Sequence, residues 1–501
     1  MGREAKSRTR YGSKRQRHSA ISAPRVHRLA ADDPLLEESI NRLGRNRPRD
    51  SAQACPVRLG TVITVAVGIM LVFLQNLGAY SISVAAGVLL TLIWSGQSGL
   101  RLIGAFVHLP LAKIDRACFI SKNWPVYSVL VPLFQEADVV SQLIRALRAL
   151  DYPRGALDVL LLVEADDPVT LEALNACDLD SRFRIIVCPK LGPQTKPKAL
   201  QIGLQLARGA FVTVFDAEDR PHPLQLKEAA TIFNRSSRHL ACLQAPLEAI
   251  VTQKSIVGTA FAAEYRLLFM RVLPALARLG IPFPIGGTSN HFRVGVLREI
   301  GGWDPFNVTE DADVAYRLAR NGFTIGMLSL PTLESTPSNA RTYLKQRSRW
   351  LKGFFITFLV VSQSFPGKFH FISFFSAFIF LIGSFSSAAL FVPGLVLVFI
   401  NQAFGSDSIF FPAIMLLWVA SSILCGFRAG CRLSEIFSLF LACFLQQLAA
   451  LRAIIELVKR PYYWDKTPHE PWRRVGSIAK PDRGRQKTLI ATRRAGSIAC
   501  H

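Results

Sequence analysis

Long apolar runs on both sides of a polar, mixed segment are the feature that most limits how this chain can fold. The runs are 59–75 and 80–107 before the polar segment, and 371–400, 409–425 and 436–457 after it. Apart from 371–400, each is near the roughly 20 residues that a helix needs to cross a bilayer. The longer run is broken by Pro393-Gly394, so we expect a tight pair of crossings there. We therefore predict two spans, a soluble domain and four further spans.

The charge of the chain sets the orientation of these spans. Half of its 501 residues are hydrophobic, yet its formal net charge is +24. Lys and Arg gather on the cytoplasmic side of membrane proteins. We therefore place both basic ends, 1–57 and 459–501, in the cytoplasm together with the domain between the spans. We interpret 1–57 as a disordered arm that contacts anionic lipid rather than nucleic acid, since it directly precedes a span.

Several functional classes have no support in the sequence. The nine cysteines are scattered, without a C-x-x-C pair or a neighbouring histidine pattern, which argues against a disulfide scaffold and a zinc site. The sequence also has no Ser-His-Asp pattern and no glycine-rich phosphate loop.

Short apolar strands alternate with helices between about 127 and 330, which predicts an α/β domain. The expected strands are 127–131, 157–163, 183–188 and 210–215, and the expected helices are 139–150 and 196–207. The strands are nearly continuous in Val, Ile, Leu and Phe, as in a parallel sheet with helices on both faces. Ligands of such sheets bind outside the carboxyl ends of the strands.

Three acidic clusters follow one another in this segment. They are Glu164-Ala165-Asp166-Asp167, Asp216-Ala217-Glu218-Asp219 and Thr309-Glu310-Asp311. Neighbouring carboxylates repel one another unless a cation or hydrogen bonds compensate them. Mg²⁺ or Mn²⁺ would do so, because such ions take one or two carboxylates and share their other positions with substrate phosphate. Each cluster alone could equally be a solvated loop or an acidic helix N-terminus.

The stretch Gln346-Arg347-Ser348-Arg349-Trp350 lies where the mixed pattern ends. In a helix, Gln346, Arg349 and Trp350 share one face. This face suits a sugar: indole offers an apolar plate, an amide can bind hydroxyls, and a guanidinium can hold a diphosphate. The alternative is a basic, aromatic collar at a membrane surface.

Taken in this order, the acidic clusters and the pentad resemble the D, D, D, Q-x-x-R-W signature of processive family 2 glycosyltransferases. The resemblance covers 128–350 and extends to the flanking spans. Three further segments look like a bacterial branch of cellulose-synthase-like β-glucan synthases, which includes rhizobial mixed-linkage glucan synthases. These segments are 286–292, 303–308 and 461–469.

The resemblance implies a GT-A fold, which is a Rossmann-like α/β catalytic domain, at 122–335. This domain would be inserted between α-helical transmembrane segments at 58–108 and 370–458, with the pentad and interface helices at 336–365. It also implies a nucleoside-diphosphate sugar as donor, Mg²⁺ or Mn²⁺ as cofactor, and inversion at the anomeric carbon.

Donor-binding positions carry over residue by residue. Glu164 and Asp166 would lie near the nucleoside, with Glu136 beside them. Lys196 and Lys198 open a helix next to the site and could meet the diphosphate, although basic residues in such places are often only solvated.

The metal motif carries over with one ambiguity. Asp216 matches its first acid. The sequence reads Asp-Ala-Glu-Asp where many relatives have Asp-x-Asp, so Glu218 and Asp219 are both candidates for the second acid.

The acceptor side carries over from the third cluster and the pentad. Asp311 matches the general base that removes a proton from the acceptor hydroxyl. Glu310, Gln346, Arg349 and Trp350 would bind the acceptor and the diphosphate.

The resemblance thus implies an inverting, metal-dependent synthase in the bacterial inner membrane that polymerises sugar, with UDP-glucose as the expected donor, into an extracellular β-glucan. Its partners would be the donor, the growing glycan, membrane lipid and a periplasmic export protein, but not nucleic acid. One alternative is a non-processive membrane glycosyltransferase that glycosylates a lipid. A second alternative is a non-enzymatic membrane scaffold.

Overall fold

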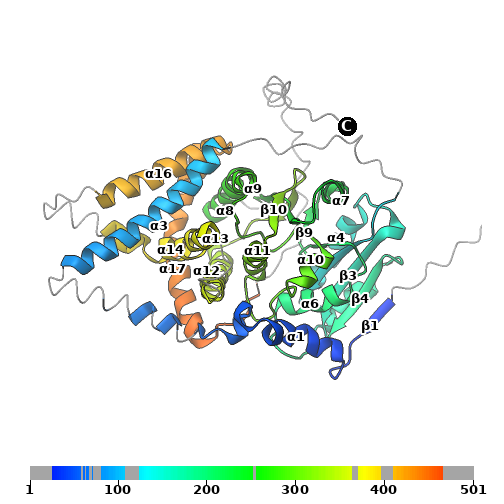
Figure 1. The fold of residues 1–501 in the computed structure, drawn as a ribbon. Coiled ribbons are helices and arrows are strands. Elements are labelled where there is room, and N and C mark those ends of the chain that lie inside the picture. The colour runs from blue at the N-terminus through cyan, green and yellow to red at the C-terminus, as the bar shows by residue number, and fades with distance from the viewer. Residues whose placement is uncertain are drawn as a thin grey trace, which may run out of the picture.

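The computed structural model describes residues 25–57, 60–62, 64–66, 70, 80–107, 123–251, 255–363, 371–396 and 410–466. The molecule has an α/β part and a helical part (Figure 1). The strands and the helices that cover them lie at one end in this view. At the other end lie the long helices α3 (Tyr80–Phe106), α16 (Phe410–Arg428) and α17 (Leu433–Lys459).

An eight-stranded sheet forms the centre of the α/β part. Its order is β1 (Arg25–Arg28), β4 (Phe183–Cys188), β3 (Leu157–Glu164), β2 (Tyr127–Leu133), β5 (Phe211–Val214), β9 (Asn290–Arg293), β7 (Leu240–Gln244) and β10 (Thr324–Met327). Neighbouring strands are parallel, except that β9 runs antiparallel to both β5 and β7. The four strands expected from the sequence are β2 to β5, so the predicted parallel sheet is confirmed.

Both faces of this sheet are buried, as the sequence predicts. The helices of the α/β part include α4 (Ala137–Arg148), α5 (Pro168–Asn175), α6 (Lys196–Leu206), α7 (Gln225–Arg235), α10 (Val294–Glu299) and α11 (Glu310–Arg320). Alternate residues of β3 belong to different cores, with Leu160 and Leu162 in one cluster and Leu161 and Val163 in the other. Two-sided burial explains why the strand is continuously apolar instead of alternating.

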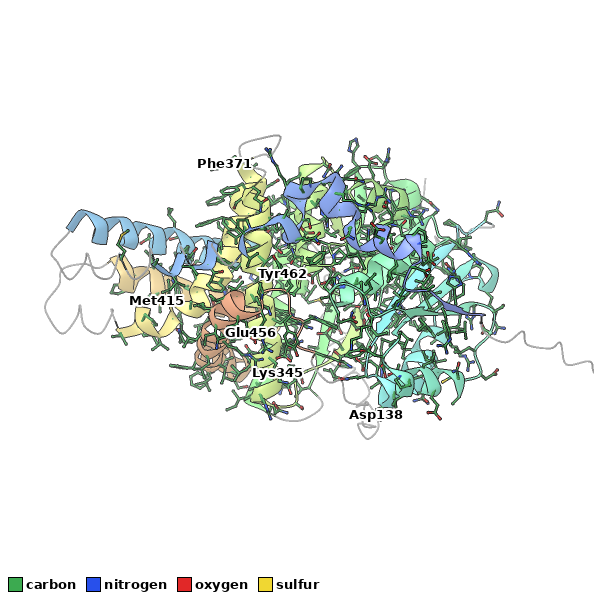
Figure 2. The ribbon with its side chains drawn as sticks, turned by 90° about the horizontal axis from the view of Figure 1, so that it is seen from below. Asp138, Lys345, Phe371, Met415, Glu456 and Tyr462 are labelled. Atoms are coloured by element: carbon green, nitrogen blue, oxygen red, sulfur yellow. The ribbon has the colours of Figure 1, made fainter. Side chains whose placement is uncertain are left out.

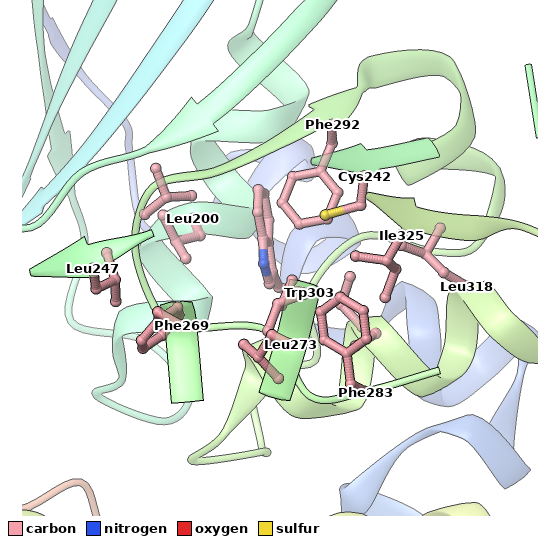
Figure 3. Packing of buried hydrophobic residues seen from close by; sticks show 14 of the residues in the cluster. Leu200, Cys242, Leu247, Phe269, Leu273, Phe283, Phe292, Trp303, Leu318 and Ile325 are labelled. Carbon is pink, nitrogen blue, oxygen red and sulfur yellow. The ribbon is translucent and has the colours of Figure 1, made fainter. Parts of the chain in front are cut away.

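One core extends beyond the sheet to the chain around Trp303. The buried Trp303 ring meets Phe292 edge-on, with ring centroids 5.7 Å apart (Figure 3). Leu273 and Phe283 pack in the same cluster. This packing fixes the start of the loop that leads into α11, where the third acidic cluster begins.

A second sheet has three strands, in the order β6 (Arg220–Pro221), β11 (Thr332–Ser335) and β8 (Leu247–Ile250). β11 pairs antiparallel with β6 and parallel with β8. Because β6 directly follows the second acidic cluster and β11 precedes α12 (Ala340–Ser362), this sheet connects that cluster to the helix that carries the pentad.

The expected disordered arm over 1–57 is wrong for residues 25–57, which fold onto the α/β part. β1 forms the edge of the large sheet beside β4, and α1 (Pro34–Asn46) buries Leu36, Ile40 and Leu43. These three residues stand at i, i+4 and i+7 and form a narrow apolar stripe on the helix. The stripe is not evident from the composition of the segment, because many charged residues surround it. The predicted disorder of 1–24 lies outside the described residues.

The prediction of six membrane spans is supported only in part. Within the described residues, two helical stretches, Phe371–Ala389 and Leu433–Lys459, are long and apolar enough to cross a membrane, and Pro412–Arg428 is a shorter apolar helix. The first expected span, 59–75, lies mostly outside the described residues. In the expected pair at 371–400, residues 371–389 form one helix with a π-helical turn, and 397–400 are outside the described part.

Candidate active site

A cavity of about 800 Å³ lies at the carboxyl ends of β2, β3 and β5. The helix α8 (Ile256–Leu267), α12 and the segment after α17 supply its other walls. Most of the site residues expected from the sequence line this cavity, namely Glu136, Glu164, Asp166, Asp216, Glu218, Glu310, Asp311, Gln346, Arg349 and Trp350. The structure does not bring Lys198 and Asp219 to its wall.

A lysine occupies the centre of the acidic groups. The Lys196 ammonium, on the first turn of α6, lies 2.5 Å from Asp216 Oδ1 and donates to the Gly287 carbonyl at 2.7 Å. Burial opposes its charge, but the charges of Asp216 and Glu310 prevail and raise the pKa of Lys196. Lys196 therefore stays charged and neutralises part of the cluster.

The turn after β5 settles which second acid faces the cavity. Asp219 Oδ2 accepts a hydrogen bond of 2.6 Å from the Asp216 backbone N–H and another from the Thr288 hydroxyl. Asp219 is thus a buried brace that fixes the turn, whereas Glu218 lines the cavity. Of the two candidates for the second metal acid, the geometry favours Glu218.

The acids at this turn fit a metal site in which the substrate diphosphate supplies the other ligands. Within the described ranges, no group of three or more His, Cys, Asp or Glu side chains is arranged to hold a metal ion. Mg²⁺ bound to a diphosphate, however, needs only one or two protein carboxylates. Asp216 and Glu218, both at the cavity, meet that requirement.

Two carboxyl groups begin α11. Asp311 Oδ1 accepts a hydrogen bond of 2.7 Å from the Ala312 N–H. Burial raises the pKa of Asp311 to about 6, and burial together with the Asp311 charge raises the pKa of Glu310 to about 8. Asp311 is the one of the pair that is ionised at neutral pH, so it can accept a proton.

The pentad lies on α12, and its expected face does line the cavity. Gln346, Arg349 and Trp350 point toward it, while Arg347 forms a two-pronged ion pair with Glu264 of α8, at 2.7 and 2.6 Å. Arg347 is buried and Glu264 is partly buried, and the pair joins α12 to α8.

The Trp350 ring is held between its neighbours. It stacks on Tyr265 with an interplanar angle of 25° and ring centroids 6.5 Å apart, and the Arg347 guanidinium lies 4.7 Å from its centre. The remaining surface of the indole is available to the cavity.

The expected donor-binding acids have basic partners. Lys198 is fully buried and donates to Glu164 Oε2 at 2.8 Å, so it supports Glu164 from behind. Asp166 pairs with the exposed Lys190 at 3.1 Å.

The sequence marked 461–469 as a segment that resembles the family but assigned it to a basic tail beginning at 459, and did not place it at the site. Residues 462–466 line the cavity, and Lys466 Nζ donates to the Gln135 carbonyl at 2.8 Å and lies 3.0 Å from Glu136 Oε1. Tyr462 of this segment is labelled in Figure 2. The aromatic run Tyr462-Tyr463-Trp464 inside an otherwise basic stretch was the available signal. The remainder of the predicted tail, 467–501, lies outside the described residues.

Comparison with known proteins agrees with this geometry. Residues 125–353 match the model of the family described as glycosyltransferase like family 2. This stretch is similar to glycosyltransferase family 2 domains. It contains all three acidic clusters and the pentad, which agrees with the expected family and does not decide on the processive branch.

Two curated relatives illustrate which proteins this chain is similar to. A glucomannan 4-beta-mannosyltransferase 2 of Arabidopsis thaliana is 24% identical over 241 residues, which are 46% of this chain and 45% of the relative. A beta-monoglucosyldiacylglycerol synthase of Trichormus variabilis is 24% identical over 286 residues, which are 54% of this chain and 60% of the relative. The chain thus spans about half the length of these relatives.

A solved structure supports the fold of the glycosyltransferase. The mannosyltransferase PcManGT from Pyrobaculum calidifontis, in complex with GDP-Man and Mn²⁺, matches with a TM-score of 0.50 and 17% identity. The match covers 74% of this chain and 99% of that chain. The expected GT-A-like α/β fold is therefore confirmed.

Proposed function

We propose that the protein is an inverting, metal-dependent membrane glycosyltransferase that extends a β-glycan, with UDP-glucose as donor and an extracellular β-glucan as product. The observation that carries this proposal is the convergence of Asp311, Arg349 and Asp216 on one cavity. A single displacement with inversion needs one base behind the acceptor hydroxyl and positive charge around the leaving diphosphate. These residues supply both.

Each group has a distinct task in this reaction. Asp311 accepts the proton of the attacking hydroxyl, and its place in the first turn of α11 stabilises the carboxylate. Arg349 and Lys196 stabilise the negative charge of the departing nucleoside diphosphate. Mg²⁺ or Mn²⁺ held by Asp216 and Glu218 would add Lewis-acid stabilisation of the same charge. The Mn²⁺ and GDP-Man in the PcManGT structure are consistent with such a metal.

The acceptor could be a glycan or a lipid. The names of the two relatives cover both, since one acts on glucomannan and the other makes a glucosyldiacylglycerol. The aromatic platform at Trp350 favours a glycan, because a sugar ring stacks on indole and must be bound again after every addition. A lipid acceptor is the second candidate, and the two apolar helices would place the cavity near the membrane that holds it. The glycosyltransferase domain argues against a non-enzymatic scaffold.

The proposal can be tested with membranes that contain the full chain. They are incubated with a panel of labelled nucleoside-diphosphate sugars, with and without EDTA, and the products are sized and analysed for linkage. We expect metal-dependent incorporation from UDP-glucose into a high-mass β-glucan. A product limited to one sugar on an extractable lipid would overturn the processive part of the proposal.

The rate of transfer should depend on pH through Asp311. Its pKa of about 6 lies above the usual range for Asp, so the base is charged above pH 6 and protonated below it. At saturating donor, we expect transfer to fall by about tenfold for each pH unit below the pKa of the base. A profile measured from pH 4.5 to 8 checks this. Full activity at pH 4.5 would contradict the assignment of the base.

Trp350→Ala should shorten the product more than it slows donor use. Loss of one aromatic contact, worth about 1 kcal/mol, would change the ratio of elongation to release by about fivefold at each addition. Gel filtration of the product beside a nucleotide-release assay in the same membranes measures both quantities. We expect high-mass glucan to disappear while nucleotide release remains measurable, and Trp350→Phe to be intermediate.

The control for this variant is Trp124→Phe, which alters an indole that packs on Tyr152 and does not line the cavity. It should leave the product length unchanged. Full-length glucan made by Trp350→Ala at the normal rate would refute the role of the platform.

A further inference from the structure

Glu334 lines the cavity although nothing in the sequence marked it. Residues of β11 alternate, so that Thr332 and Glu334 are buried on one face of the small sheet. The Thr332 hydroxyl is held inside the protein, by Gln225 at 3.0 Å and Ser289 at 2.6 Å. Glu334, two residues further on, reaches the cavity wall with only 7% of its surface exposed.

Glu334 has fewer hydrogen-bond donors around it than Glu228, a buried acid whose role is structural. Glu228, buried on α7, receives hydrogen bonds from the Ser329 N–H at 2.8 Å, the Ser329 hydroxyl at 2.5 Å and the Leu330 N–H at 3.0 Å. Glu334 forms no ion pair within the described residues, and the neighbouring Tyr265 hydroxyl is the group that lowers its pKa. Burial and the charges of Glu218, Asp219 and Asp216 raise the pKa of Glu334 well above the usual range for Glu, which favours the neutral carboxyl.

A buried carboxyl with so few protein donors costs stability unless a ligand or water supplies the missing hydrogen bonds. Because Glu334 faces a cavity of about 800 Å³, a ligand has room to reach it. The donors to be supplied are O–H or N–H groups.

A second polar group at the same cavity also lacks a hydrogen-bond donor. Gln346 Oε1 is buried and has no hydrogen-bond partner in the described part of the chain. Like the carbonyl oxygen of the Glu334 carboxyl, it is an acceptor. Two acceptors favour a ligand rich in hydroxyl donors and disfavour a phosphate, which would bring further negative oxygens.

The apolar wall of the same cavity suits a pyranose ring. Tyr265 stacks on Trp350 with an interplanar angle of 25°, and both rings line the cavity. Tyr265 and Glu334 both line this cavity, so the aromatic wall and the acid belong to one surface. An apolar plate edged by hydroxyl acceptors is complementary to a sugar, whose ring is apolar on its faces and whose hydroxyls lie at its rim.

We propose that Glu334 and Tyr265, together with Gln346, form a subsite that binds the hydroxyls of the acceptor's terminal sugar. The acceptor is then a glycoside, and a bare lipid alcohol such as diacylglycerol leaves Glu334 and Gln346 unpaired. This inference rests on the proposed transfer reaction and names the class of acceptor that it uses.

The first test compares Glu334→Gln and Glu334→Ala with the wild type in full-length protein. The acceptors are a β-linked glucose disaccharide and, separately, diacylglycerol in phosphatidylcholine vesicles, and donor hydrolysis without acceptor is measured in parallel. We expect Glu334→Ala to raise the KM for the disaccharide about tenfold or more, because a buried partner of the sugar hydroxyl is lost, while hydrolysis changes less than twofold. Glu334→Gln, which keeps one acceptor oxygen and the side-chain volume, should have a smaller effect.

The matched control is Glu248→Gln on the neighbouring strand β8. Glu248 is partly buried beside Arg266 and does not line the cavity. It should leave the KM for the disaccharide unchanged. An equal loss in hydrolysis and transfer by the Glu334 variants, or an effect confined to the donor KM, would overturn the inference. Efficient use of diacylglycerol by the wild type would overturn it as well.

The second test asks which hydroxyl Glu334 binds. Monodeoxy derivatives of the disaccharide are compared in the wild type and in Glu334→Ala. One derivative should lose about tenfold in kcat/KM with the wild type and nothing further with Glu334→Ala, because the partner of that hydroxyl is already gone. Equal sensitivity of both proteins to every derivative would refute the subsite. A wild type that neither hydrolyses the donor nor transfers sugar would instead refute the proposed function itself.

Discussion

The Asp311→Asn variant is expected to transfer sugar about 1,000-fold more slowly than the wild type while it binds the donor normally. The amide preserves the shape of the carboxylate and its hydrogen bond from the Ala312 N–H, but it cannot accept a proton. Glu310, the adjacent carboxyl, does not replace it easily, because its pKa of about 8 keeps it largely protonated at neutral pH. Transfer of labelled sugar and the Kd of the nucleotide, measured on the same preparation, check both parts.

A matched variant separates loss of the base from a general effect of the substitution. Asp151→Asn removes an exposed carboxylate that pairs with Lys227 at 2.7 Å and does not line the cavity. It should leave transfer unchanged. If Asp311→Asn transferred sugar at the wild-type rate, another group would have to be the base. A parallel loss of nucleotide affinity would indicate a damaged fold instead.

The sheet and the acids at its edge could be predicted from the sequence because their signals are local. A strand buried on both faces is continuously apolar, as β3 is, and the residues that follow parallel strands meet at one edge whatever the rest of the chain does. Glu164 and Asp216, which lie at the ends of β3 and β5, therefore line one cavity as expected. The shared face of Gln346, Arg349 and Trp350 could be predicted from helical spacing alone.

The choice between Glu218 and Asp219 could not be made from spacing. It depends on Thr288, which lies in a distant segment and whose hydroxyl donates to Asp219. The role of Glu334 is hidden for a similar reason. An acid on a short strand is usually solvated, but Glu334 is buried in the folded chain, in a small sheet against which α8 packs.

The errors at the two ends of the chain have a common physical origin. Segments 25–57 and 460–466 are polar on average, and average polarity predicts disorder or a solvated tail. Their order comes from contacts between distant residues: the Ala52 N–H donates to Asp304 at 2.6 Å, and the Tyr462 hydroxyl donates to the Ala52 carbonyl at 3.0 Å. The two segments thus hold one another beside the loop that leads to the base.

The Asp216→Ala variant should abolish transfer and should weaken nucleotide binding only when Mg²⁺ or Mn²⁺ is present. Asp216 can serve in two ways, as a metal ligand or as the partner of the Lys196 ammonium 2.5 Å away. A metal that bridges a carboxylate and a diphosphate contributes to nucleotide affinity only when it is present. If Asp216 acts through such a metal, we expect the Kd of the nucleoside diphosphate in Mn²⁺ to rise about tenfold or more in the variant, which corresponds to about 1.4 kcal/mol.

In EDTA, the wild type and the Asp216→Ala variant should bind the nucleotide with the same affinity, because neither then has the bridging ion. If Asp216 acts only through Lys196, the affinities should differ equally in EDTA and in Mn²⁺, since an ammonium does not respond to a chelator. Asp178→Ala, which removes an exposed carboxylate outside the cavity, controls for the loss of charge. Wild-type transfer that persists in EDTA would exclude the metal and leave Lys196 as the cation that neutralises Asp216.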